Sequence, residues 1–139
     1  MKITETIHAF RHSFRLALGE GRYADRFVYS YLLLGEKVCL IDTGVSATVP
    51  LLLSDLKQIG RTPQEISTVI LTHAHPDHIG GNINTEGKPV YPNARWVIWR
   101  DEWQFWISDQ SEKQLAERQK HKAEYCAAIH ICGFCRKIS

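Results

Sequence analysis

Three of the seven histidines in this chain fall within six residues, at His73, His75 and His78, with Asp77 between the last two. The residues before them, 68–71, are apolar or β-branched, which predicts a buried strand. Side chains two apart on a strand point the same way. We therefore expect His73 and His75 to converge on one point just beyond the end of this strand.

The donor types in this stretch are those of a transition-metal site. Pro76 cannot continue a strand ladder, so Asp77 and His78 should leave the turn in directions different from those of His73 and His75. One ion is not expected to take all four groups, whereas two neighbouring ions could share them. Imidazole and carboxylate suit Zn²⁺, and also Fe or Mn. The alternative, a set of ordinary polar residues, would require a dense cluster to be desolvated without a cation, which is costly.

Asp42 is a second candidate, because it directly follows the predicted strand 38–41. A carboxylate at a strand end beside a histidine cluster can accept the second N–H of a metal ligand, which fixes the tautomer of the ring and raises its basicity. The alternative is that Asp42 forms an Asx-type turn with Thr43 and Gly44. The residues alone leave both interpretations open.

Residues 72–78, Thr-His-Ala-His-Pro-Asp-His, followed by Gly80 and Gly81, resemble the His-x-His-x-Asp-His signature of the metallo-β-lactamase-fold hydrolases. Residues 40–44 are similar to the strand-ending Asp-Thr-Gly of that family, and the resemblance fades after about Glu117. It implies an α/β chain that forms the N-terminal half of an αββα sandwich. The third metal-binding histidine, bridging aspartate and final histidine of the family have no counterpart, so we expect a truncated chain.

The resemblance also implies a role for each residue of the site. His73 and His75 would bind a first ion, Asp77 and His78 a second, and Asp77 would also be catalytic by orienting the attacking hydroxide. It favours Asp42 as the residue that holds a metal ligand. The implied cofactor is zinc, as one or two ions, with iron or manganese as alternatives.

The implied activity is metal-dependent hydrolysis, in which a metal-activated hydroxide attacks an ester, lactone, thioester or related bond of a small molecule. Two alternatives stay open. A catalytic zinc normally has three protein ligands, and only two are visible for the first ion, so the chain would then be a metal-binding remnant without activity. The other alternative is an iron-bound oxidoreductase on the same scaffold.

Composition limits the partners and the compartment. A chain of 139 residues, 44% hydrophobic, predicts one globular domain. A net charge of +2 predicts neither nucleic acid nor an anionic membrane as a partner. The first residues lack an apolar signal core, so we expect a cytoplasmic protein with reduced thiols for its four cysteines.

The predicted elements are a hairpin within 2–18, a turn at 19–21, strands at 27–34, 38–41, 68–72 and 94–99, helices at 47–59 and 100–125, and a short helix from about His78. Residues 62–65 form a connector with capping character. Residues 1–124 are predicted to be a partial metallo-β-lactamase-like domain, and 125–139 an atypical tail. The tail residues Cys126, His130, Cys132 and Cys135 are a weak candidate for a small zinc site, because a single Cys-x-x-Cys lacks a second pair.

Two further patterns concern packing. Gly80 and Gly81 lack a Cβ, which allows backbone to lie close against the site. Trp99, Trp103 and Trp106 are spaced i, i+4, i+7, which predicts a helical stripe that packs on the sheet rather than a ligand platform. Only one sheet's worth of strands can be counted. We therefore expect an open apolar face with the histidine cluster at its rim, and self-association or low stability as its consequence.

Overall fold

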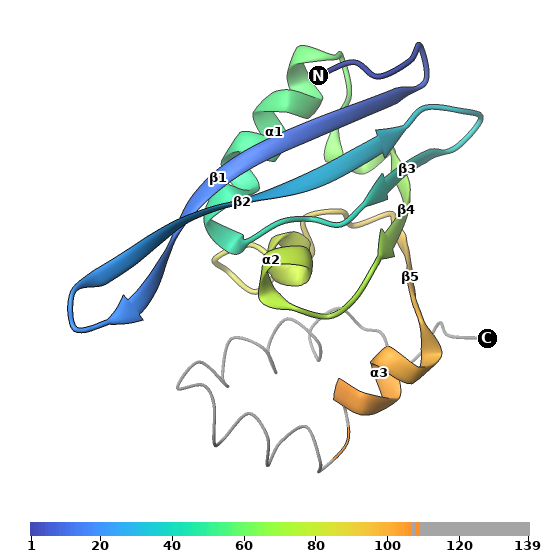
Figure 1. Cartoon of the computed structure of the whole chain (residues 1–139). Helices are drawn as coiled ribbons and strands as arrows, with labels where there is room; N and C mark the ends of the chain where they lie inside the picture. The colour runs from blue at the N-terminus through green and yellow to red at the C-terminus, as the bar shows by residue number, and fades with distance from the viewer. Residues whose placement is uncertain (107, 109–139) are drawn as a thin grey trace.

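The computed structural model describes residues 1–106 and 108, which form a single five-stranded sheet with short helices around it (Figure 1). The strands are β1 (Ile7–Gly19), β2 (Arg22–Leu33), β3 (Val38–Ile41), β4 (Ile66–Leu71) and β5 (Arg95–Ile98). Their order in the sheet is their order in the sequence. β1 pairs with β2, and β2 with β3, in antiparallel fashion, whereas β3 pairs with β4, and β4 with β5, in parallel.

The hairpin predicted within residues 2–18 is reduced to one isolated antiparallel bridge between Lys2 and His8, because from Ile7 onward β1 is one continuous strand that pairs with β2 along its whole length. From Ile7 to Leu18 the alternation of apolar residues is the pattern of a single strand, and this part holds no glycine or proline that would turn the chain. The predicted turn at 19–21 is confirmed, with positive φ at Gly19, Glu20 and Gly21. Because β3 pairs only with residues 31–33 of β2, this hairpin projects beyond the other strands (Figure 1).

Helix α1 (Val49–Gln58) follows a 3₁₀ turn, η1 (Ser46–Thr48), and agrees closely with the predicted helix. Pro50 lies in its first turn, where its missing N–H costs nothing. Gly60 has φ +72°, and the N–H of Arg61 reaches back to the carbonyl of Leu56 at 2.8 Å, which closes the helix. The side chain of His12 on β1 joins Asp55 of α1 through a 2.7 Å hydrogen bond, so the helix is fixed to one face of the sheet.

The core lies between α1 and this inner face of the sheet. Leu32, Leu40 and Val69 from the strands and Leu52 and Leu56 from the helix are completely buried. Strand residues alternate between faces, so their neighbours in sequence point to the other side.

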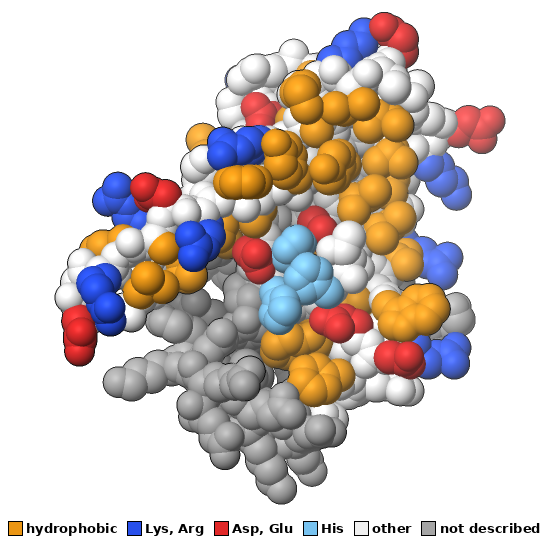
Figure 2. All heavy atoms as spheres, viewed as in Figure 1, with side chains coloured by type: hydrophobic (Ala, Val, Ile, Leu, Met, Phe, Trp, Pro, Cys, Tyr) orange, Lys and Arg blue, Asp and Glu red, His pale blue; other side chains and the backbone are white. Residues whose placement is uncertain are grey.

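That other side, which we call the outer face, carries half-buried or exposed apolar side chains from all four neighbouring strands β2 to β5: Phe27, Tyr29, Tyr31, Leu33, Cys39, Ile41, Ile70 and Val97. Phe27 is 54% exposed, Tyr31 38% and Val97 38%. Figure 2 shows hydrophobic side chains in a broad band over the sheet, with the histidines below it. The described residues thus leave this face open, as expected.

Four short helical segments complete the described part: η2 (Pro63–Glu65), α2 (Pro76–Ile79), η3 (Gly80–Asn82) and α3 (Arg100–Trp106). α2 begins two residues before the predicted start at His78. Trp103 and Trp106 of α3 pack against the core, as the stripe predicts, but Trp99 is 72% exposed and does not. The predicted continuation to residue 125 and the tail 125–139 lie outside the described residues. None of the described helices is long and apolar enough to span a bilayer.

Candidate metal centre

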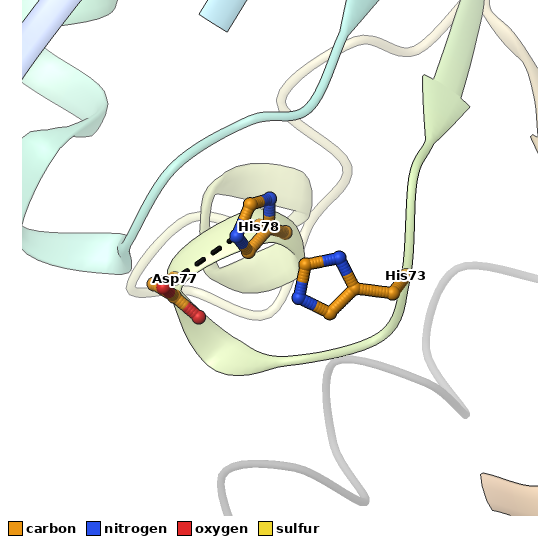
Figure 3. Close-up of side chains that lie close together, drawn as sticks. All are labelled: His73, Asp77 and His78. Carbon is orange, nitrogen blue, oxygen red and sulfur yellow. Dashed lines mark ion pairs between the residues drawn. The ribbon is translucent and has the colours of Figure 1, made fainter. Parts of the chain in front are cut away.

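Three of the predicted ligands come together just beyond the end of β4. His73 lies in the segment after the strand, and Asp77 and His78 lie on α2, so their side chains converge (Figure 3). One ligand atom from each lies within 4.8 Å of the others, and all three residues are half-buried. Two imidazoles and a carboxylate at this spacing are a donor set that suits a divalent transition ion.

His78 is oriented by the buried carboxylate of Asp42. Asp42 Oδ2 lies 2.8 Å from His78 Nδ1, and the same carboxylate accepts the backbone N–H of Thr72 at 2.8 Å and its hydroxyl at 2.7 Å. With Nδ1 donating to Asp42, Nε2 of His78 faces Asp77 Oδ2 at 3.5 Å. The hydrogen bond from Asp42 raises the pKa of His78, against the opposing effect of burial. The geometry matches the predicted placement of Asp42, and its effect on a bound ion stays a prediction.

His73 is favoured in its neutral form. Burial lowers its pKa, and the neighbouring rings of His78 and His75 lower the pKa further. The ring centroids of His73 and His78 are 3.9 Å apart. Thr72 gives its one hydroxyl proton to Asp42, so its oxygen, 3.1 Å from Nδ1 of His73, is free to accept from that nitrogen. Nε2 of His73 is then unprotonated, which is the state that binds a metal ion.

His75 lies beside this group rather than in it. Its exposed ring is 4.6 Å from that of His73 and 5.6 Å from that of Trp106, in edge-on contact with both. The structure therefore brings His73 together with Asp77 and His78, whereas the sequence paired His73 with His75. The division of four ligands between two ions stays a prediction.

The close approach predicted for the two glycines is confirmed. A Cβ on Gly81 would overlap the carbonyl oxygen of Thr43, and a Cβ on Gly80 would lie 2.8 Å from the backbone nitrogen of Ser46. The backbone N–H of Thr43 donates to the carbonyl of His78 at 2.8 Å. These contacts hold α2 and η3 against the end of β3, which places Asp42 within reach of His78.

Glu102 on α3 is a contributor that sequence reasoning missed. Its Oε1 accepts the backbone N–H of Ala74 at 2.8 Å and the indole N–H of Trp106 at 2.7 Å. Ala74 is the residue between His73 and His75. The one signal in the sequence was a glutamate four residues before a tryptophan on a predicted helix, which is compatible with many surface helices.

A model of the metallo-beta-lactamase superfamily matches residues 23–117 of this chain. The anti-Pycsar protein Apyc1 of Paenibacillus sp. (strain J14) is 40% identical over 63 residues, which are 44% of this chain and 24% of that protein. The exodeoxyribonuclease WalJ of Streptococcus pneumoniae is 30% identical over 96 residues, 66% of this chain and 35% of that protein.

Among solved structures, AidC, a dizinc quorum-quenching lactonase in complex with a product, is similar with a TM-score of 0.68 and 30% identity. The match covers 84% of this chain and 44% of that one. The chain therefore spans less than half the length of each of these relatives. Because the family model covers well over half of the chain, including His73, His75, Asp77 and His78, the chain belongs to the metallo-beta-lactamase superfamily.

Proposed function

We propose that this chain carries the metal centre of a hydrolase that uses divalent ions, zinc first among them, to cleave an ester, lactone, thioester or related bond in a small molecule. The observation that carries the proposal is the convergence of His73, Asp77 and His78 next to the end of β4. The hydrogen bond from Asp42 to His78 adds support, because ligands held in this way are typical of functional metal sites.

Each residue has a role in this proposal. His73 and His75 would hold one ion, and Asp77 and His78 another. Bound divalent ions supply a Lewis acid and lower the pKa of a bound water toward neutrality. Asp77, half-buried beside His78, accepts a hydrogen bond from the attacking water and orients it. Asp42 keeps the proton of His78 on Nδ1, so Nε2 stays available for binding.

The relatives and the net charge support one substrate class over another. The lactonase matches a larger share of this chain than either curated relative does, which supports a lactone or a related carbonyl compound. The nuclease relative raises the phosphodiester as an alternative. A net charge of only +2 does not favour a polyanionic substrate.

Metal uptake is the first test. The parent chain should bind at least one divalent transition ion by elemental analysis after dialysis. The double variant His73→Ala/His75→Ala should lose the first ion, because it removes both of that ion's imidazoles. His8→Ala, on β1, is the matched control and should bind as the parent does. Unchanged stoichiometry in the double variant would show that these histidines are not ligands.

Turnover is the second test. The chain loaded separately with Zn²⁺, Mn²⁺ or Fe²⁺ is offered a lactone, an ester, a thioester and single-stranded DNA. Hydrolysis of a carbonyl substrate that disappears in Asp77→Asn would support the proposal. Metal uptake without hydrolysis would instead identify a metal-binding remnant. Iron in protein purified without added metal, together with electron transfer to dioxygen, would favour the oxidoreductase.

A further inference from the structure

Glu102 contacts the segment that carries two proposed ligands, although it lies 28 residues away in sequence from Ala74. We propose that Glu102 is a positioning residue of the metal centre. By accepting the N–H of Ala74 it fixes the backbone on both sides of that residue, and so holds His73 and His75 in the directions that a divalent ion requires. This inference rests on the proposed function, because it concerns the same site.

The peptide between the two histidines is held through the N–H of Ala74, while on its C-terminal side the carbonyl of His75 accepts the N–H groups of His78 and Ile79. Ala74 is 2% exposed, and its N–H donates to Glu102 Oε1. A buried N–H without an acceptor costs about 1–3 kcal/mol, so this bond restricts the segment to conformations that keep it. The Cβ of Ala74 packs in the core, and the bond to Glu102 adds a restraint on the direction of the N–H. The carboxylate therefore helps to set its direction.

Trp106 reinforces the same contact from the next turn of α3. Its indole N–H donates to the same oxygen of Glu102 at 2.7 Å, and its ring meets that of His75 edge-on at 5.6 Å. Residues four apart share one face of a helix. α3 thus presents a hydrogen-bond acceptor to the backbone at Ala74 and an aromatic surface to the side chain of His75.

The carboxylate of Glu102 is also suitably charged. Burial alone would raise its pKa, but the hydrogen bonds from Ala74 and Trp106, with smaller effects of His73 and His75, lower it overall. Glu102 is therefore ionised at neutral pH. A negative charge behind two imidazoles adds to the attraction for a cation without occupying a coordination position.

A structural role is the competing explanation. Glu102 lies in the first turn of α3, where an acidic side chain is favourable next to the helix dipole. Asp101 shares that position, is exposed and accepts the indole N–H of Trp99 at 3.3 Å. Asp101→Asn is therefore a matched control that removes an acidic group from the same turn.

The experiment measures the affinity for Zn²⁺ by competition with a chelator, the visible spectrum of the Co²⁺ form, and the unfolding of the metal-free chain in urea. Glu102→Ala should weaken affinity by about 10- to 100-fold and alter the Co²⁺ spectrum. Glu102→Gln keeps an oxygen acceptor for Ala74, so it should stay within about threefold of the parent and restore the spectrum. Trp106→Phe keeps the ring but removes the donor, and should cause an intermediate loss.

The outcomes separate the two explanations. Equal affinity in Glu102→Ala and the parent, or equal losses in Glu102→Ala and Asp101→Asn, would overturn the positioning role. If Glu102→Ala fails to fold, the other two variants decide the question. A higher affinity for Zn²⁺ in Glu102→Gln than in Trp106→Phe supports the proposal, and a lower affinity overturns it. A parent chain that binds no metal overturns the proposed function, and this inference with it. A parent that binds metal but does not turn over leaves this test fully valid.

Discussion

Asp42 connects the end of one strand to the loop after another. Its carboxylate accepts hydrogen bonds from the backbone N–H and the hydroxyl of Thr72 and from the ring of His78. Its backbone has φ +55°, in the left-handed region that non-glycine residues rarely occupy. Such a backbone persists only where its surroundings enforce it, which is common at functional sites. The contact with His78 is the one that the orienting role would need, and that role stays a prediction.

Asp42→Asn should weaken metal affinity by about 10- to 100-fold, because the amide no longer supplies a charged acceptor for the N–H of His78. Asparagine tolerates left-handed backbone, so the fold should survive. A chelator competition titration gives the affinity, and far-ultraviolet circular dichroism checks the fold. Asp25→Asn, at an exposed ion pair on the hairpin, is the control. Equal affinities for Asp42→Asn and the parent would rule out this role.

Residues of the site were predictable where the signal is local. His73, Asp77 and His78 belong to one short motif, and the structure gathers them. Glu102 was not predictable, because its contact with Ala74 depends on where α3 packs, and that is set by tertiary structure. For the same reason the sequence could not show that the ring of His75 lies against Trp106.

At the scale of elements, η3 is fitted directly onto the end of β3. Gly81→Ala should destabilise the chain by about 1–3 kcal/mol, because its methyl group would meet backbone that cannot move independently. Urea unfolding measures the loss. At Gly35 a Cβ would make only an ordinary contact of 3.6 Å, so Gly35→Ala should change stability by less than about 0.5 kcal/mol. Similar values for the two variants would contradict this account of η3.

The connector before β4 carries the predicted capping box. The backbone N–H of Thr62 donates to Glu65 Oε2 at 2.7 Å, and Arg61 Nη1 lies 3.1 Å from Oε1. The Thr62 bond first, and the Arg61 bond second, lower the pKa of Glu65 below its ordinary value of 4.5. A depressed carboxyl pKa adds stability that is present above pH 4.5 and is lost as pH falls through the lower, folded value.

A carbon-detected NMR titration of Glu65 should therefore give a midpoint below 4.5. Arg61→Ala should raise that midpoint only part of the way, because the bond from Thr62 remains. A midpoint for Glu65 that Arg61→Ala leaves unmoved would remove the arginine from the explanation.

Elements were predictable where periodicity and end signals agree. Pro50 and Gly60 mark the two ends of α1, and the strands around the motif follow from their apolar runs. β2 begins at Arg22 rather than near Phe27, because the exposed residues 22–26 gain their strand conformation from pairing with β1. A pairing partner is information that a local pattern does not contain.

For the whole molecule, the outer face of the sheet determines whether the chain self-associates. In the described part of the chain Phe27, Tyr31 and Val97 of this face are at least 38% exposed and its other apolar residues are half-buried. A contiguous apolar face of this kind usually marks an interface or an aggregation liability. A second copy of the chain would offer the same face, and two such faces can pack as the layers of a sandwich. We therefore predict self-association that increases with concentration in the micromolar range, measured by sedimentation velocity.

Two variants distinguish association through the outer face from non-specific association through other surfaces. Tyr31→Lys/Val97→Lys places two charges on the outer face and should shift the chain toward monomer. Leu51→Lys changes a 50% exposed leucine on α1, remote from that face, and should sediment as the parent does. A parent that stays monomeric throughout the range, with cooperative unfolding, would show that the outer face is covered within one chain.

The order of the strands has a consequence for synthesis. In the described part of the chain, each strand after β1 pairs with the strand made just before it, so it has a partner as soon as it is made. Ribosomes add about 5–20 residues per second. A hairpin such as β1–β2 closes in about 1–10 μs, far faster than the next strand is made. Assembly can thus keep pace with translation from the first hairpin onward. The segment with His73, Asp77 and His78 is made after β1, β2 and β3, and its arrival supplies the contacts that hold Asp42, whose backbone N–H donates to the carbonyl of Ile70 on β4.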